Sequence, residues 1–200
     1  MGVERWRLEV PQREAMRREL RELLAKLAVR HGTFTLSSGA ASDFYVDCRV
    51  VTMLPRAMRL LGALLLDALS DLDDVQGVGG LTLGADPIAA AVAMASADTG
   101  REVPMFIVRK EPKGHGTRRL IEGAFPEEAG APVAIVDDVI TKGGAVMKAI
   151  EAVRAETAAQ VVRVLLIVDR QEGGAEMLRR QGYDVRALFT RQDFAAESAE

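Results

Sequence analysis

The stretch VAIVDDVITKGGA, residues 133–145, decides the fold of this 200-residue chain. Its first four residues are apolar and mostly β-branched, which is typical of a buried strand in a parallel sheet. Two adjacent carboxylates, Asp137 and Asp138, follow this run, and a Gly143–Gly144 pair precedes an alanine-rich helical pattern. This order predicts a strand, an acidic loop, a glycine turn and a helix.

The chemistry of the stretch predicts a ligand. Open α/β sheets bind their ligands beyond the carboxyl ends of such strands. Ionised carboxylates only accept hydrogen bonds, so Asp137 and Asp138 suit paired hydroxyls such as a ribose diol. The backbone N–H groups of residues 141–145 stand at a helix N-terminus, which favours an anion. Each feature alone is common in ordinary loops, but together they predict a pocket for a ribose 5-phosphate.

Strand and helix patterns alternate over the rest of the chain from residue 75 onward. Apolar runs indicate further strands, and helical patterns lie between them; the strands are expected at 75–78, 103–108, 161–168 and 185–189. The alternation predicts a mainly parallel central sheet with helices on both faces. Since no linker marks a second domain, we interpret residues 1–200 as one domain, with an α/β core at 55–191 and a frayed tail at 192–200.

The first 54 residues are expected to form a separate layer of the same domain. Apolar residues at helical spacing after Pro11 predict an amphipathic helix, with Gly32 as its stop. Residues 34–36 and 44–51 have the pattern of two strands joined by a polar turn. We call this N-terminal region, residues 1–54, the hood. Pro55 then opens the next helix.

Composition excludes several classes of protein. The net charge is −3, which argues against a general nucleic-acid binder. Cys48 is the only cysteine, so no internal disulfide can form, and a small buried apolar residue is its simplest interpretation. The longest apolar runs fall short of the ~18 residues that a membrane span needs, and the N-terminus lacks a signal-peptide pattern. A cytoplasmic protein that binds no membrane is therefore expected.

A basic loop follows the strand that ends at residue 108. Residues 109–119, RKEPKGHGTRR, contain five lysines or arginines and one glutamate, broken by Pro112 and two glycines. Such a loop is costly to order by itself but favourable to order on a polyphosphate. Lys113 and His115 taken singly are most simply solvated surface residues, whereas the cluster as a whole favours a closing lid.

The 133–145 stretch resembles the signature of type I phosphoribosyltransferases, which bind 5-phosphoribosyl-1-pyrophosphate (PRPP). The resemblance implies the type I phosphoribosyltransferase fold and a PRPP site within this stretch. The residues it assigns to PRPP are Asp137, Asp138, Val139, Ile140, Thr141, Lys142, Gly143, Gly144 and Ala145. Lys142 stands at a variable position of the signature, so only its backbone amide is expected to take part.

Further stretches resemble the orotate phosphoribosyltransferase family, over about residues 34–170. The basic loop matches that family's R-K-x-x-K-x-H-G lid at Arg109, Lys110, Lys113, His115 and Gly116. The lid residues would join the PRPP site, and Lys113, with Asp137 and Asp138, would be catalytic. Many members carry a lysine where Ser37 stands and a Tyr–Lys pair where Leu83–Gly84 stands, so only backbone contacts are expected from residues 82–85.

Residues 169–172, D-R-Q-E, match a string in which the arginine binds the orotate carboxylate. Arg170 offers a rigid fork of donors suited to that group, and an ion pair with Asp169 or Glu172 is the alternative. Residues 34–45 resemble the family's F-x-L-x-S-G stretch, whose aromatic end lies against the base. Tyr45 and Thr141 are therefore the other expected orotate contacts.

The family resemblance implies a transferase of pyrimidine biosynthesis. It would transfer the 5-phosphoribosyl group from PRPP to N1 of orotate, giving orotidine 5′-monophosphate and pyrophosphate. Mg²⁺ would be the cofactor, held mostly by PRPP oxygens and water, without a dedicated protein metal site. The resemblance also implies a homodimer in which the lid reaches the neighbouring subunit. Two alternatives stay open: a PRPP-binding regulator of the same fold, and a phosphoribosyltransferase for another base.

Overall fold

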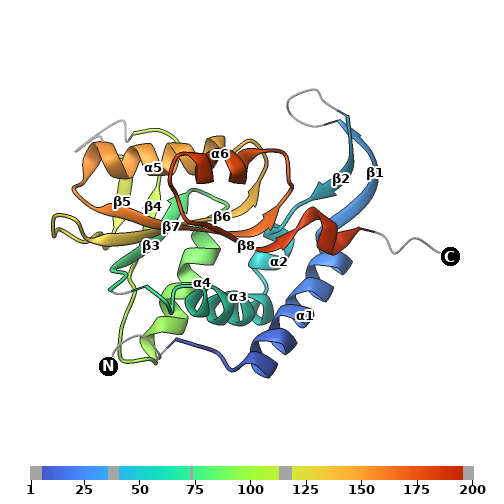
Figure 1. Cartoon of the computed structure of the whole chain (residues 1–200), viewed down its shortest axis with the longest axis horizontal. Helices are drawn as coiled ribbons and strands as arrows, with labels where there is room; N and C mark the ends of the chain where they lie inside the picture. The colour runs from blue at the N-terminus through green and yellow to red at the C-terminus, as the bar shows by residue number, and fades with distance from the viewer. Residues whose placement is uncertain (1–5, 36–40, 73, 113–118, 196–200) are drawn as a thin grey trace.

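The computed structural model describes residues 6–35, 41–72, 74–112 and 119–195 (Figure 1). Its centre is a six-stranded sheet in the order β5-β4-β3-β6-β7-β8, in which only β5 is antiparallel to its neighbour. The strands are β3 (Gly77–Leu81), β4 (Met105–Val108), β5 (Ile121–Gly123), β6 (Pro132–Ile140), β7 (Gln160–Asp169) and β8 (Val185–Thr190). The predicted mainly parallel sheet is confirmed.

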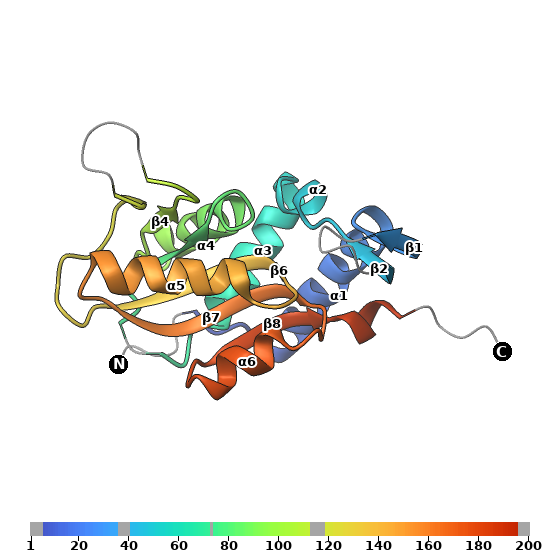
Figure 2. The ribbon, with the colours of Figure 1, turned by 90° about the horizontal axis from the view of Figure 1, so that it is seen from above.

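Helices cover both faces of the sheet, as the sequence predicts (Figures 1 and 2). The helices α5 (Gly144–Glu156) and α6 (Gly174–Arg180) lie on one face, and α1 (Val10–Leu27), α3 (Pro55–Asp67) and α4 (Asp86–Ala97) lie on the other. Side chains of β6 alternate between the two layers. Val133 and Ile135 pack with α5, whereas Ala134 and Val136 pack with α3 and α4. No helix within the described ranges is long and apolar enough to cross a membrane.

The hood differs from its predicted boundaries. Helix α1 ends at Leu27, and Gly32, the predicted stop, lies inside strand β1 (Val29–Thr35). This strand pairs antiparallel with β2 (Ala41–Val46), so the predicted hairpin is present with a longer first strand. The β-branched Val29 leaves the helix because the pairing with Val46 offers its backbone a sheet partner.

The predicted strand at residues 44–51 is wrong in its second half. Strand β2 ends at Val46, and the chain turns into the short helix α2 (Arg49–Thr52). Cys48, Val51 and Thr52 are fully buried while the residues between them are exposed. That spacing matches one face of a helix against the core, not the alternation of a strand. Burial also raises the pKa of the Cys48 thiol, which agrees with a structural cysteine.

Two further differences lie at the edges of the sheet. The three-residue strand β5 has no periodicity that the sequence could show, and it exists because it pairs with β4. The predicted tail at 192–200 begins with ordered structure, the 3₁₀ turn Arg191–Phe194. Phe194 is 6% exposed, and its ring centre lies 5.6 Å from that of Phe189. This aromatic contact, made across the end of β8, is why residues 191–194 are not frayed.

Candidate active site

The carboxyl end of β6 carries two adjacent carboxylates. Asp137 is 6% exposed, and Asp138 is half-buried beside it. The backbone N–H of Asp138 donates to Asp137 Oδ1 over 3.0 Å, and the N–H of Val139 donates to Asp138 Oδ1 over 2.8 Å. The predicted acidic loop is part of the strand, because β6 continues to pair with β7 as far as Ile140 opposite Asp169.

The two carboxyl groups are shielded from water, which disfavours their ionised forms. Burial, and secondarily the charge of Asp138, raise the pKa of Asp137 to about 7. Burial also raises the pKa of Asp138, although the hydrogen bond from Val139 opposes it. Within the described residues neither carboxylate forms an ion pair with arginine or lysine. Such a pair favours a ligand that brings hydroxyl donors or positive charge.

Glycine shapes the turn between β6 and α5. Gly143 adopts φ +83°, and a Cβ on it would lie 2.9 Å from Met177 Cε. Helix α5 begins at Gly144, so its first N–H groups have no acceptor within the helix. Lys142 Nζ donates to the backbone oxygen of Glu172 over 2.8 Å, which turns this side chain toward the β7–α6 loop. The turn has the geometry of an anion site built from backbone amides.

The loop between β3 and α4 lies directly against the carboxylates. A Cβ on Gly84 would lie 2.9 Å from Asp138 Oδ1 and 3.0 Å from Asp137 Oδ1. A side chain at this position would therefore displace the carboxylates. Thr82 Oγ1 donates to Asp86 Oδ2 over 2.6 Å, which ties the loop to the first turn of α4.

These elements enclose a cavity of about 330 Å³. Six of the predicted site residues line it: Tyr45, Lys110, Asp137, Asp138, Val139 and Ala145. Seven others lie outside its lining: Arg109, Ile140, Thr141, Lys142, Gly143, Gly144 and Arg170. Lys113 and His115 lie outside the described residues. The structure thus brings the carboxylate pair, one residue of the basic loop and one hood aromatic together.

Two charged lining residues, Asp47 and Arg49, escaped the sequence analysis. Arg49 donates to both oxygens of Asp47, with Nε–Oδ1 at 2.8 Å and Nη2–Oδ2 at 3.0 Å, and this pairing lowers the pKa of the Asp47 carboxyl. Both line the cavity, and the positive charge of Arg49 favours ionisation of Asp138. No motif marks them, because they reach the site only through the turn from β2 into α2. The only available signal was that Asp47 and Arg49 directly follow a strand with two aromatic residues.

The hood also contributes Tyr45 on strand β2. Its side chain is exposed, and its ring centre lies 5.5 Å from that of Phe34 on the paired strand β1. Of this aromatic pair, Tyr45 lines the cavity. A planar apolar group would find a stacking partner there.

Arg170 follows β7 and is 6% exposed. Its Nη2 donates to the backbone oxygen of Phe44 over 3.1 Å and lies 2.8 Å from Glu172 Oε1. The guanidinium carbon stands 5.9 Å from the centre of the Phe44 ring. The ion pair that the sequence allows as an alternative role is therefore present, and Arg170 also joins the central sheet to the hood.

The basic loop is anchored where it leaves and rejoins the sheet. The N–H of Arg109 donates to the Leu120 oxygen over 2.8 Å, and its guanidinium lies 3.7 Å from Glu122. Glu156, at the end of α5, accepts the N–H of Leu120 over 2.8 Å. Helix α5 therefore connects the glycine turn at its start with the base of the loop at its end. Lys110 is exposed and lies at the cavity.

The donor set for a metal ion is small. Among the described residues, no group of three or more His, Cys, Asp or Glu side chains is placed to hold one. Mg²⁺ usually binds proteins through one or two carboxylates together with substrate phosphates and several waters. The buried pair Asp137 and Asp138 fits an ion of this kind that is carried mainly by substrate oxygens.

Sheet order, acidic strand end, glycine turn and hood together define a phosphoribosyltransferase. The family model described as "Phosphoribosyl transferase domain" matches residues 78–192. The chain is 46% identical over 180 residues to the orotate phosphoribosyltransferase of Nostoc sp., covering 89% of this chain and 84% of that one. It is 50% identical over 151 residues to the orotate phosphoribosyltransferase of Streptomyces avermitilis, covering 76% and 81%.

Solved structures agree with these relatives. The orotate phosphoribosyltransferase of Mycobacterium tuberculosis in complex with Fe(III) dicitrate superposes with a TM-score of 0.78 at 42% identity, covering 90% of this chain and 99% of that one. The same enzyme in complex with PRPP superposes with a TM-score of 0.74 at 38% identity, covering 90% and 98%. The chain belongs to the orotate phosphoribosyltransferase family.

Proposed function

We propose that this protein transfers the 5-phosphoribosyl group from PRPP to N1 of orotate, giving orotidine 5′-monophosphate and pyrophosphate in pyrimidine biosynthesis. The observation that carries this proposal is the buried pair Asp137 and Asp138 beside a glycine turn, in a chain whose relatives are orotate phosphoribosyltransferases. A solved relative contains PRPP. The basic loop and Arg170 support orotate as the acceptor.

Asp137 and Asp138 hold the two ribose hydroxyls of PRPP in this proposal. Each ionised carboxylate accepts a hydroxyl hydrogen, and their negative charge favours the positive charge that develops on the ribose ring as the C1–O bond breaks. The close approach of Gly84 supports the assignment, because it leaves room beside the carboxylates only for backbone. The raised pKa of Asp137 means that substrate must favour the ionised form.

The 5-phosphate binds at the turn before α5. The residues of this turn, 141–145, offer backbone N–H groups at the positive end of the helix. The left-handed backbone of Gly143 supports this role because it lets the chain enter the helix sharply, directly after the strand that carries the carboxylates. Val139 and Ile140 complete the PRPP segment through their backbone.

The departing pyrophosphate is stabilised by the basic loop. Lys113 acts on the leaving oxygen with Arg109, Lys110 and His115, and closure of the loop excludes water. Three observations support this role: the loop is rich in lysine and arginine, Lys110 lines the cavity, and both ends of the loop are hydrogen-bonded to the core. Two substrates held in line supply the remainder of the rate enhancement.

Orotate lies between the hood and the end of β7. Arg170 binds its carboxylate, Thr141 contacts the base, and Tyr45 covers the ring. The contacts of Arg170 with Phe44 and Glu172 fix the orientation of its planar guanidinium, which supports a bidentate contact with a carboxylate. The exposed ring of Tyr45 at the cavity supports the stacking role.

Mg²⁺ is the proposed cofactor, bound mostly by PRPP oxygens and water near the carboxylate pair. When bound, it neutralises charge on the pyrophosphate. The protein's own contribution is to orient the ribose through Asp137 and Asp138 and to keep water out. A purified preparation treated with EDTA is expected to lose turnover and to regain it on addition of Mg²⁺.

We further propose that the protein is a cytoplasmic homodimer in which the basic loop of one subunit reaches the active site of the other. Large exposed apolar side chains of α2 and its C-cap, Val50 and Met53, support a partner there. Mixing inactive Lys113→Ala and Asp137→Asn proteins tests the sharing. Shared sites predict that mixed dimers regain activity, because one of their two sites contains both parent residues; sites complete within one subunit predict no such recovery after subunit exchange.

The reaction itself is tested by the loss of orotate absorbance after PRPP and Mg²⁺ are added, with adenine, guanine and uracil as parallel acceptors. Rapid, Mg²⁺-dependent loss of orotate alone is expected. If adenine, guanine or uracil is consumed in place of orotate, that base is the acceptor. If no base reacts although PRPP raises the melting temperature, the protein binds PRPP without transferring its ribosyl group.

A further inference from the structure

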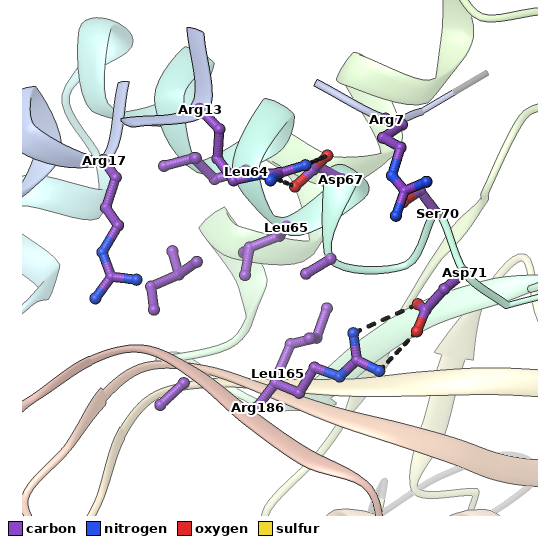
Figure 3. Close-up of a pocket in the computed structure, with 13 residues that line it drawn as sticks. Arg7, Arg13, Arg17, Leu64, Leu65, Asp67, Ser70, Asp71, Leu165 and Arg186 are labelled. Carbon is purple, nitrogen blue, oxygen red and sulfur yellow. Dashed lines mark hydrogen bonds and ion pairs between the residues drawn. The ribbon is translucent and has the colours of Figure 1, made fainter. Parts of the chain in front are cut away.

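A second cavity, of about 330 Å³, lies on the face of the sheet covered by α1 and α3 (Figure 3). Its walls come from α1, the last turn of α3 with the residues after it, and strands β7 and β8. It shares no lining residue with the candidate active site. The volume falls within the range of small-molecule sites, about 300–1,000 Å³.

The charge of this cavity is opposite to that of the whole chain. Four arginines and two aspartates line it, an excess of two positive charges, whereas the chain carries a net charge of −3. The charged residues are Arg7, Arg13, Arg17, Arg186, Asp67 and Asp71. Figure 3 shows the four guanidinium groups spread around the cavity; three of them come from residues 7–17 and one comes from β8. This concentration of positive charge favours an anion.

Two of the arginines are held in place by the aspartates. Arg13 donates to Asp67 through Nε at 2.6 Å and through Nη2 at 2.9 Å. Arg186 Nη2 donates to Asp71 Oδ2 over 2.7 Å. A guanidinium has five N–H donors, so each arginine keeps donors beyond those that its aspartate accepts. These two groups are therefore rigid and still able to bind a ligand.

The other two arginines are held less tightly. The Arg17 side chain is 46% exposed, its nearest carboxylate contact is Asp193 at 3.6 Å, and its guanidinium carbon lies 5.0 Å from the Phe189 ring centre. Arg7 is exposed and has no hydrogen bond or ion pair within the parts of the chain that the structure describes. Both can turn toward an anion without breaking a strong pair.

The floor of the cavity is apolar. Leu64 and Leu65 of α3, Leu165 of β7 and Leu188 of β8 line it between the arginines. Leu64 and Leu165 are almost fully buried, so they form a fixed surface. A ligand that fits has one apolar side and one anionic end.

We propose that this cavity binds a small amphipathic dianion, of the class of phosphate monoesters with an apolar or aromatic body. The phosphate is bound by Arg7 and Arg17, whose guanidinium groups are exposed and loosely held, and arginine forks match phosphate oxygens. A phosphate monoester carries about −1.5 to −2 charges at pH 7, which matches the excess of two positive charges among the lining residues. The apolar body rests on the leucines, and Arg13 and Arg186 border it.

Calorimetric titration with naphthyl phosphate tests the site, with PRPP and Mg²⁺ present in excess so that the active site is filled. The variant Arg7→Gln/Arg17→Gln removes the two loosely held positive charges, and the matched control Arg18→Gln/Arg21→Gln removes two exposed charges of α1 that do not line the cavity. We expect one saturable site in the parent and the control, and at least tenfold weaker binding in the variant. All four arginines are on the surface, so melting curves are expected to stay within a few degrees of each other.

Three results would overturn the proposal: no saturable binding to the parent, equal weakening in the control, or equal affinity for uncharged naphthol. Inorganic phosphate is expected to bind at least tenfold more weakly than naphthyl phosphate, and equal affinity would remove the role of the leucines. The same titration on Asp137→Asn is expected to be unchanged. Binding of PRPP is titrated separately, so a failure of the proposed reaction is distinguished from a failure of this site.

Discussion

The two cavities place aspartates in opposite electrostatic situations. At the end of β6, Asp137 lies beside Asp138 without a basic partner among the described residues, and burial raises its pKa to about 7. At the second cavity, Asp71 accepts hydrogen bonds from Arg163 and Arg186. The bond from Arg163 is the main reason that the pKa of Asp71 is well below its usual range.

Under the proposed function, this difference separates a carboxylate that binds substrate from one that stabilises the fold. Asp71 helps to satisfy Arg163, which is only 2% exposed and also contacts Asp184 and the backbone oxygen of Ala68. The paired charges connect the end of α3 to strands β7 and β8. Asp137 and Asp138 form no ion pair within the described residues, so their burial costs free energy, which the proposed substrate would offset.

The largest expected effect comes from neutralising the unpaired carboxylate. Asp137→Asn keeps the shape of the side chain but removes the charge opposite the developing positive charge of the ribose. We expect kcat for orotidine 5′-monophosphate formation to fall on the order of 100-fold or more. Steady-state rates with the exposed Asp98→Asn as control would measure it. A kcat within threefold of the parent would place the carboxylate outside the chemistry.

The same substitution is expected to stabilise the protein at alkaline pH. A carboxyl whose folded pKa of about 7 exceeds its unfolded value of 3.8 binds its proton more tightly in the folded state, so stability falls as pH rises from about 4 to about 7. Asp137→Asn removes this loss, which we expect to be worth ~4 kcal/mol at pH 8 and very little at pH 4. Urea unfolding at both pH values checks it; an equal gain at both would contradict the pKa shift.

Breaking the paired network should have the opposite signature. Arg163→Met leaves Asp71, Asp184 and the Ala68 oxygen without their buried donor, and the aspartates are partly exposed and can regain water. We therefore expect a loss of ~2 kcal/mol in the free energy of unfolding, less than for a fully buried pair, with kcat unchanged. The exposed Arg180→Met is the control. A stable but inactive Arg163 variant would remove the distinction between the two regions.

The smallest of these effects concerns the fit around the carboxylates. A methyl group at Gly84 would come within 3.0 Å of both carboxylate side chains, so Gly84→Ala must push one of them aside. We expect roughly a tenfold loss of kcat/KM, about 1.4 kcal/mol, with little change in melting temperature. Leu83→Ala, in the same loop with an exposed side chain, should retain activity. Full activity of Gly84→Ala would mean that the carboxylates tolerate displacement.

Much of the fold could be predicted because its signals are local. Alternating apolar runs and helical patterns predicted the order of most elements from residue 55 onward, and the predicted helix start at Pro55 agrees with α3. The failures lie where long-range pairing or packing decides. Strand β5 forms only against β4, and Phe194 is ordered by its contact with Phe189.

The site divides in the same way. Asp137 and Asp138 could be identified because strand, carboxylates and glycine turn follow one another within thirteen residues. Asp47 and Arg49 could not, since they belong to a different part of the chain and reach the cavity through the turn from β2 into α2. Nothing near Gly84 in sequence indicates that its neighbours in space are carboxylates.

The sequence by itself therefore determined the alternation of strands and helices, the acidic end of β6 and the glycine turn after it, because hydrophobic period and backbone freedom act between near neighbours. Only the tertiary structure decided which charges are paired. Asp71 meets Arg163 across 92 positions, whereas Asp137 forms no ion pair with the arginines and lysines of the described chain. Packing sets those distances, and the distances decide whether a buried carboxylate is paired with an arginine, like Asp71, or left unpaired as in the proposed substrate site.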